Sequence, residues 1–296
     1  MTMENKAKLA ILYAGAVWGL FWIPLRRLEA EGIDPLWVTS IYFMVPAAII
    51  FPVLMFRWRS IASGGLGLQL TVLVSGAALS LYSASIVFTD VIRAIMLFYL
   101  MPIWSTLLAR VFLGEAITPI RILAMILAAL GMLTLFGLGV GLPIPRNVGD
   151  WMGLGAGVFW AIAMVRIRLN DQHNAIDLTT GFFFWGLALT LAISLLFAHD
   201  HVPSWDQVKP ALPLLVVFVA ILVIPGTFAS LWGPKFISPG ISGLLFMTEI
   251  VVGAISAALL AGEPFGQREL VGVALIASAS LIEPIMSLRK GRDALK

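Results

Sequence analysis

Apolar runs long enough to cross a bilayer follow one another along almost the whole chain, and only short polar turns separate them. A transmembrane helix needs about 20 consecutive, mostly apolar residues. The pattern therefore predicts an all-α integral membrane protein with ten transmembrane helices, and the turns are too short to hold a separate extramembrane domain. The predicted helices cover residues 9–26, 36–56, 67–88, 91–112, 119–138, 150–168, 178–197, 210–231, 238–261 and 265–286.

Parts of this pattern occur twice. The run from Phe98 to Glu115 reads FYLMPIWSTLLARVFLGE, and a run of equal length with the same Gly-Glu ending, FMTEIVVGAISAALLAGE, follows 148 positions later. An Ala-Gly-x-x-Trp sequence that begins at Ala14 in the first predicted helix recurs 142 positions later at Ala156 in the sixth. The repeats indicate that the chain consists of two related halves.

Each predicted half has five helices, and an odd number makes the second half enter the membrane from the opposite side. The pattern thus predicts an inverted repeat, which is common among secondary transporters. We expect a first five-helix repeat over 1–138, a Gly- and Pro-containing linker over 139–149, a second, inverted repeat over 150–288 and a basic cytoplasmic tail over 289–296.

Composition supports the membrane class. Hydrophobic residues make up 60% of the chain and charged residues 12%, whereas about a quarter of the residues in soluble domains are charged. The chain has no cysteine, which excludes disulfides and thiolate chemistry. Of the 19 lysines and arginines, thirteen fall on the side of the membrane that holds the N-terminus. Because cytoplasmic segments carry the excess of positive charge, both termini are predicted to be cytoplasmic.

Short motifs give the chain a family resemblance. The Ala-Gly-x-x-Trp-Gly run that ends at Gly19, Pro102 thirteen residues before Glu115 of a Leu-Gly-Glu, and the second Gly-Glu resemble the drug/metabolite transporter superfamily, most closely its ten-helix EamA-type exporters. The aromatic helices look most like those of the aromatic amino-acid exporters of the bacterial inner membrane. The resemblance implies export by alternating access through a central cavity between helices 1 to 4 and 6 to 9, with helices 5 and 10 peripheral. One departure is that Ile250 stands where the first half has Pro102, so the motif predicts no proline kink in the ninth helix.

An acid, Glu249, lies near the centre of the ninth predicted helix. A carboxylate at that depth is costly and should face protein or a water-filled cavity rather than lipid. Helical spacing places it on one stripe with Ser242, Phe246, Gly253 and Ser256, and such stripes commonly pack against other helices. We predict that Glu249 lines the cavity and is the candidate for proton coupling. The alternative is a buried structural hydrogen bond.

The other mid-depth residues of interest are aromatic residues and prolines. The aromatic residues either stack on planar or cationic substrates or fill space between helices. Proline and glycine can leave backbone N–H and C=O groups without a partner in the helix. Inside a membrane, such groups are tolerated only where protein or water surrounds them. The predicted substrate-binding residues are Trp18, Tyr42, Tyr82, Tyr99, Trp160, Trp185, Phe246 and Glu249, and the predicted hinges are Pro46, Pro102, Pro225 and Gly226.

The sequence also argues against several functions. No lysine or arginine is predicted at mid-depth, so the substrate is expected to be neutral, zwitterionic or cationic. No nucleophile, metal-ligand cluster or nucleic-acid surface is visible, so we expect no enzyme, cofactor or metal; a channel is a further alternative. The sequence predicts a multi-pass secondary transporter of the inner membrane that exports small amphipathic metabolites, with aromatic amino acids first by resemblance. The alternative is an exporter of lipophilic cations or drugs, coupled to protons through Glu249.

Overall fold

The computed structural model describes residues 2–137 and 144–293, and in this part of the chain it contains helices and turns but no strand. The described residues form ten spans long and apolar enough to cross a membrane, which confirms the predicted fold class. Six spans are single helices: α3 (Pro35–Ser63), α4 (Gly65–Phe88), α7 (Pro119–Phe136), α8 (Val148–Leu169), α9 (Ala175–Phe197) and α15 (Gln267–Asp293).

Four spans are interrupted. The first consists of α1 (Met3–Gly19) and α2 (Trp22–Ala30), the fourth of α5 (Val91–Phe98) and α6 (Met101–Leu113), the eighth of α11 (Leu212–Phe218) and α12 (Ile224–Trp232), and the ninth of α13 (Pro239–Phe246) and α14 (Thr248–Ala261). The breaks in the fourth and ninth spans lie at equivalent places in the two sequence runs, directly after Phe98 and Phe246. The ninth span therefore breaks without a proline, which the motif did not predict.

The predicted helix limits differ from the observed ones most at the first span and at α3, which continues to Ser63 instead of ending at residue 56. The first span begins at Met3 instead of residue 9, and the short helix α10 (Trp205–Val208) lies in the loop before α11. Residues 138–143 of the predicted linker lie outside the described residues, and α8 begins at Val148. The predicted tail begins inside α15, which continues to Asp293, and residues 294–296 lie outside the described residues.

Polar caps fix where several spans begin. The side chains of Asp34, Asn147 and Asn174 accept hydrogen bonds from backbone N–H groups two or three positions later, at the starts of α3, α8 and α9. Thr118 caps α7 in the same way, and Pro119 follows as the first helical residue. These bonds satisfy donors that helix starts otherwise leave unpaired.

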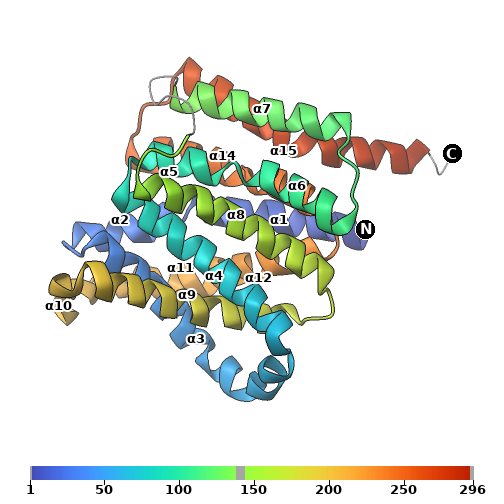
Figure 1. Ribbon diagram of the computed structural model, residues 1–296. Helices are drawn as coiled ribbons and strands as arrows, with labels where there is room; N and C mark the ends of the chain where they lie inside the picture. The colour runs from blue at the N-terminus through green and yellow to red at the C-terminus, as the bar shows by residue number, and fades with distance from the viewer. Residues whose placement is uncertain (1, 138–143, 294–296) are drawn as a thin grey trace.

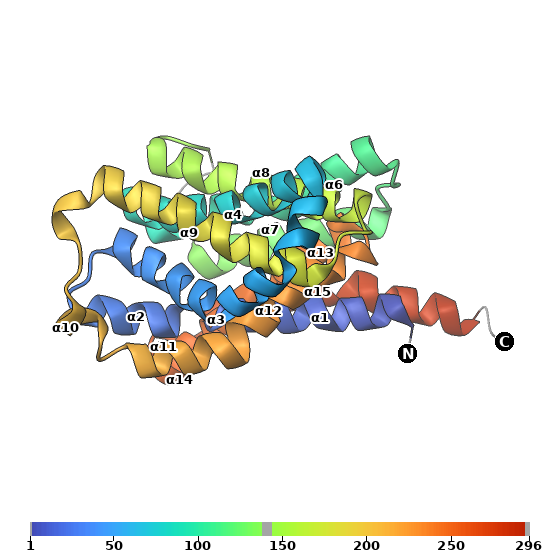
Figure 2. The ribbon, with the colours of Figure 1, turned by 90° about the horizontal axis from the view of Figure 1, so that it is seen from below.

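The two halves pack reciprocally. Helix α1 contacts α12 and α14 of the second half, and α8 contacts α4 and α6 of the first half. Helices α7 and α15 pack against each other along one edge of the bundle (Figure 1), where Gly131 lets the two backbones approach closely because a Cβ there would lie 2.9 Å from the carbonyl oxygen of Gly272. The chain starts and ends at the same end of the bundle in both views (Figures 1 and 2). We call this the terminus end and the other the far end.

Contacts between the halves differ at the two ends. At the terminus end, the Ser238 hydroxyl at the start of α13 donates to the Glu115 carboxylate after α6, and Arg121 lies 3.6 Å from the same carboxylate. The equivalent acid at the far end, Glu263, is more than half exposed and faces Arg26 at 3.8 Å. Between the described residues, no hydrogen bond or ion pair joins Glu263 to the start of α5. The fourth and ninth spans are thus tied together at one end only.

Candidate functional site

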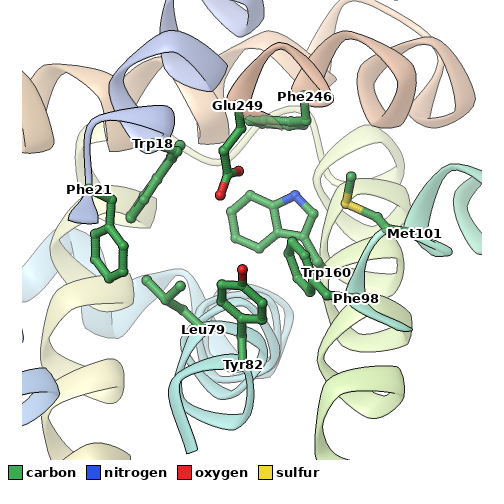
Figure 3. Close-up of a pocket in the computed structure, with 9 residues that line it drawn as sticks. All are labelled: Trp18, Phe21, Leu79, Tyr82, Phe98, Met101, Trp160, Phe246 and Glu249. Carbon is green, nitrogen blue, oxygen red and sulfur yellow. The ribbon is translucent and has the colours of Figure 1, made fainter. Parts of the chain in front are cut away.

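A cavity lies inside the bundle, beside three of the helix breaks (Figure 3). Its empty volume, which includes the open space at its mouth, is about 490 Å³. It is lined by Trp18, Phe21, Leu79, Tyr82, Phe98, Met101, Trp160, Phe246 and Glu249. None of these residues belongs to α7 or α15, as expected for peripheral helices.

The breaks position most of the lining. Trp18 and Phe21 flank the break between α1 and α2. Phe98 and Met101 flank the break in the fourth span, and Phe246 and Glu249 flank the break in the ninth. The two residues of each pair are three positions apart, a spacing that keeps side chains on one helix face, and each pair lies beside a break where helix ends meet the cavity.

The repeated Ala-Gly-x-x-Trp sequence has a structural explanation at these breaks. A Cβ on Gly157 would lie 2.5 Å from the backbone oxygen of Phe98, the last residue of α5. A Cβ on Gly15 would lie 3.2 Å from the backbone oxygen of Phe246, the last residue of α13. Each glycine therefore lets the end of a broken helix pack onto the backbone of the other half. The tryptophan three residues later then lines the cavity.

Ring contacts hold the aromatic lining in place. The Trp18 indole N–H donates to the Ser230 hydroxyl at 3.1 Å. Trp160 and Phe246 meet edge to face with ring centroids 5.7 Å apart, and the rings of Tyr82 and Phe98 lie 4.4 Å apart with an interplanar angle of 32°. Aromatic pairs in such arrangements stabilise the packing beyond the area they bury. Several rings of the lining are therefore packed against neighbouring side chains.

Glu249 is the one charged residue in the described lining. It lies in the first turn of α14, where unpaired backbone N–H groups favour a carboxylate. Its carboxylate points into the cavity, toward the hydroxyl of Tyr82 on the opposite wall (Figure 3). Between the described residues, no salt bridge is made by this carboxylate. The cavity is thus an aromatic chamber with a single acidic group.

Three of the four tyrosines in the chain gather around this acid. Tyr42, Tyr82 and Tyr99 are all close enough to interact electrostatically with Glu249. The Tyr99 hydroxyl is near the carboxylate without meeting the geometry of a hydrogen bond, and the hydroxyls of Tyr42 and Tyr99 are buried without a partner among the described residues. Buried polar groups are rarely left unpaired, so the two hydroxyls are an unusual feature of the wall behind the acid.

The structure brings together five of the eight predicted binding residues in the lining: Trp18, Tyr82, Trp160, Phe246 and Glu249. Tyr42 and Tyr99 lie just behind it. The Tyr42 ring meets Phe21 edge-on at 4.6 Å, and the Tyr99 ring meets Phe98 at 5.1 Å. Trp185 lies elsewhere: it is 37% exposed, and its indole N–H donates to the Gln69 side chain.

The predicted hinges lie at different kinds of position in the helices. Pro46 lies inside the uninterrupted helix α3, so it marks no break. Pro102 is at the start of α6, directly after the break in the fourth span. Pro225 is at the start of α12, after a π-helical turn over Val219–Val223, and Gly226 packs against Val17 of α1. Three of the predicted hinges therefore lie in the interrupted fourth and eighth spans, whereas the breaks in the first and ninth spans carry none of them.

Four lining residues were missed: Phe21, Leu79, Phe98 and Met101. Two of them could have been found from the repeat, because Phe98 and Met101 stand 148 positions before Phe246 and Glu249. Phe21 and Leu79 carry no such signal, since an apolar residue in an apolar helix gives no indication of the face it occupies. Among the residues that the structure describes, no group of acids and histidines is arranged to hold a metal ion.

The chain is similar to a family of transporters and to two bacterial proteins. The sequence model of the EamA-like transporter family matches residues 5–137 and 147–282. An uncharacterised transporter of Bacillus subtilis, YoaV, is 23% identical over 206 residues, which cover 67% of this chain and 69% of that protein. The chloramphenicol-sensitive protein RarD of Pseudomonas aeruginosa is 25% identical over 174 residues, which cover 58% of this chain and 54% of that protein.

A solved crystal structure has the same fold. It matches with a TM-score of 0.73 and 17% identity, and the match covers 96% of this chain and 98% of the other.

Proposed function

The chain belongs to the EamA-like transporter family, and from this premise we propose that it exports small amphipathic metabolites, aromatic amino acids first among them, across the bacterial inner membrane. The observation that carries the proposal is the cavity itself. Six aromatic side chains and one acid line it, and four of these aromatic side chains and the acid flank helix breaks, which is the kind of site that secondary transporters build from discontinuous helices. Flat apolar side chains of a substrate would stack on its walls.

Transport by alternating access follows from two related halves. In the proposal, the repeats at 1–138 and 150–288 are inverted copies that rock about the cavity, with both termini in the cytoplasm. The reciprocal packing of α1 and α8 on the opposite halves supports this relation. The contact of Ser238 with Glu115 at the terminus end, together with the exposed Glu263 at the far end, is the pattern expected when the cytoplasmic side is closed.

A second candidate is export of lipophilic cations, and Glu249 favours it. An acid among aromatic rings attracts cations by charge and through the ring faces. Such a site also suits exchange of a substrate cation for a proton, because the carboxylate is ionised when it holds the cation and protonated when the empty carrier returns. In this version Glu249 couples export to the proton gradient.

The test is flux in proteoliposomes that contain the purified protein. Radiolabelled tryptophan and phenylalanine, and separately the cationic dye ethidium, are followed with and without an imposed pH gradient. We expect saturable flux of the amino acids above that of protein-free vesicles. If no compound of the panel crosses faster than in protein-free vesicles, the proposed function is wrong.

The same assay assigns the role of Glu249. With Glu249→Gln, loss of gradient-driven accumulation while gradient-free exchange persists identifies proton coupling. Unchanged accumulation rejects coupling through this residue. Asp200→Asn is the matched control, because Asp200 is an acid in an exposed loop far from the cavity lining, with a side chain that is 80% exposed.

A further inference from the structure

The charges of the residues that line the cavity determine which charges a bound substrate can carry. Of the nine lining residues, one is acidic and eight carry no charge. Figure 3 shows the Glu249 carboxylate and the Tyr82 hydroxyl on facing walls, with the Trp160 indole beside them. The cavity therefore offers a substrate one negative group, several ring faces and a hydroxyl, and its described lining offers no positive group.

The buried arginines of the bundle are engaged outside the cavity. Arg93 is paired with Asp150, with 2.5 Å between the guanidinium and the carboxylate. Arg121 holds both oxygens of Glu283, at 2.9 and 3.2 Å. Guanidinium groups held by two parallel hydrogen bonds are among the strongest and most directional ion pairs in proteins. These cations are not in the lining, and their carboxylate partners already occupy them.

A zwitterionic amino acid would bring a second carboxylate close to Glu249 in such a cavity. Its ammonium group fits Glu249, but its own carboxylate would stand two bonds further on, beside another carboxylate and without a cationic partner. Like charges at short range repel more strongly away from water, and burying an unpaired charge is costly. An aromatic ammonium ion without a carboxylate meets no such conflict, because its single charge balances that of Glu249 and its ring stacks on the walls.

Building on the second candidate function, export of cations, we infer that the cavity selects arylalkyl ammonium ions that lack a carboxylate over the corresponding amino acids. Glu249 is the residue that determines this specificity. It receives the ammonium group, and the rings of Trp18, Phe98 and Trp160 surround the aromatic part. The buried hydroxyl of Tyr99 lies near the same carboxylate, just behind the lining.

The experiment compares two molecules that differ only by the carboxylate. Binding of tryptamine and of tryptophan to the purified protein in detergent is measured by isothermal titration calorimetry, which avoids leakage of the neutral amine through lipid. We expect tryptamine to bind about tenfold tighter or more, the range expected for a charge-assisted hydrogen bond and its loss. In Glu249→Gln this preference should disappear through weaker binding of tryptamine, whereas Asp200→Asn should keep it.

A second variant keeps the test decisive if Glu249→Gln does not fold. Glu249→Asp retains the charge on a shorter side chain and should keep the preference for tryptamine at lower affinity. Equal or tighter binding of tryptophan by the parent protein overturns the inference, as does a preference that survives Glu249→Gln. Tryptophan that binds equally well and is also transported would leave the proposed function standing. Absence of binding and of flux for both compounds would reject the inference and the proposed function together.

Discussion

At the scale of single residues, substitutions in the aromatic lining test whether the cavity binds the substrate. Trp160 is packed by Phe246 and lies beside the acid, so Trp160→Ala removes a stacking surface worth about 0.5–1.5 kcal/mol beyond the area it buries. We expect the apparent affinity for transported substrates to fall several-fold in Trp160→Ala, Trp18→Ala and Tyr82→Ala. The measurement is concentration-dependent flux in proteoliposomes.

Trp185→Ala is the matched control for this series. It removes the same ring from a residue that is 37% exposed and outside the cavity, so its affinity should equal that of the parent. The account of the cavity fails if the three lining variants transport like the parent, or if Trp185→Ala loses affinity as they do.

The sequence predicted polar and aromatic members of the site because such residues are unusual deep in a membrane helix. Glu249, Tyr82 and the two repeated tryptophans stood out for this reason. Leu79 did not, because apolar residues face lipid, helices and cavities alike. Trp185 shows the opposite error, since depth along a helix does not determine which face of the helix a side chain occupies.

At the scale of helices, the glycines of the repeated motif control how closely the broken spans approach. A Cβ on Gly157 would lie 2.5 Å from the Phe98 backbone oxygen, and a backbone atom cannot rotate away as a side chain can. Overpacking of this kind typically costs about 1–3 kcal/mol. We therefore expect Gly157→Ala to lower the melting temperature of the purified protein and to reduce transport, because it displaces the end of α5.

Gly155→Ala provides the control on the same helix. Its added Cβ would lie 3.9 Å from Leu81, an ordinary contact, and alanine favours helix over glycine by about 1 kcal/mol. This variant should be as stable as the parent or slightly more stable. Equal melting temperatures for the two variants would show that Gly157 has no special role in packing.

The number of helices and their approximate limits could be predicted from the length of the apolar runs. Helix breaks could be predicted only where a proline stands next to them. Pro102 stands directly after the break in the fourth span, whereas Pro46 lies within an unbroken helix. The break in the ninth span, at Met247, has no proline. Its position depends on packing against Gly15 of the other half, a contact 231 positions away in sequence that a local pattern cannot reveal.

At the scale of the whole molecule, orientation in the membrane is the first property to measure. Positive charge predicts that the terminus end is cytoplasmic. Because the chain has no cysteine, single cysteines can be introduced without removing any. Asp171→Cys lies in the exposed loop between α8 and α9 at the terminus end, and Asp200→Cys lies in the exposed loop after α9 at the far end.

In intact cells, an impermeant maleimide should label Asp200→Cys and leave Asp171→Cys unlabelled until the inner membrane is opened. The reverse pattern would place the termini in the periplasm. That outcome would invert the direction of export without changing the cavity.

We propose that the cavity beside the three helix breaks holds the substrate and opens to each side of the membrane in turn. Leu79 lines this cavity from α4, and Leu79→Cys would be the one cysteine in the chain. The measurement is the rate at which a membrane-impermeant methanethiosulfonate reagent modifies that cysteine in oriented vesicles, from each side, with and without a transported compound. The account predicts modification from both sides and slower modification when the compound is bound. Modification from one side alone, or a rate that a transported compound leaves unchanged, would contradict it.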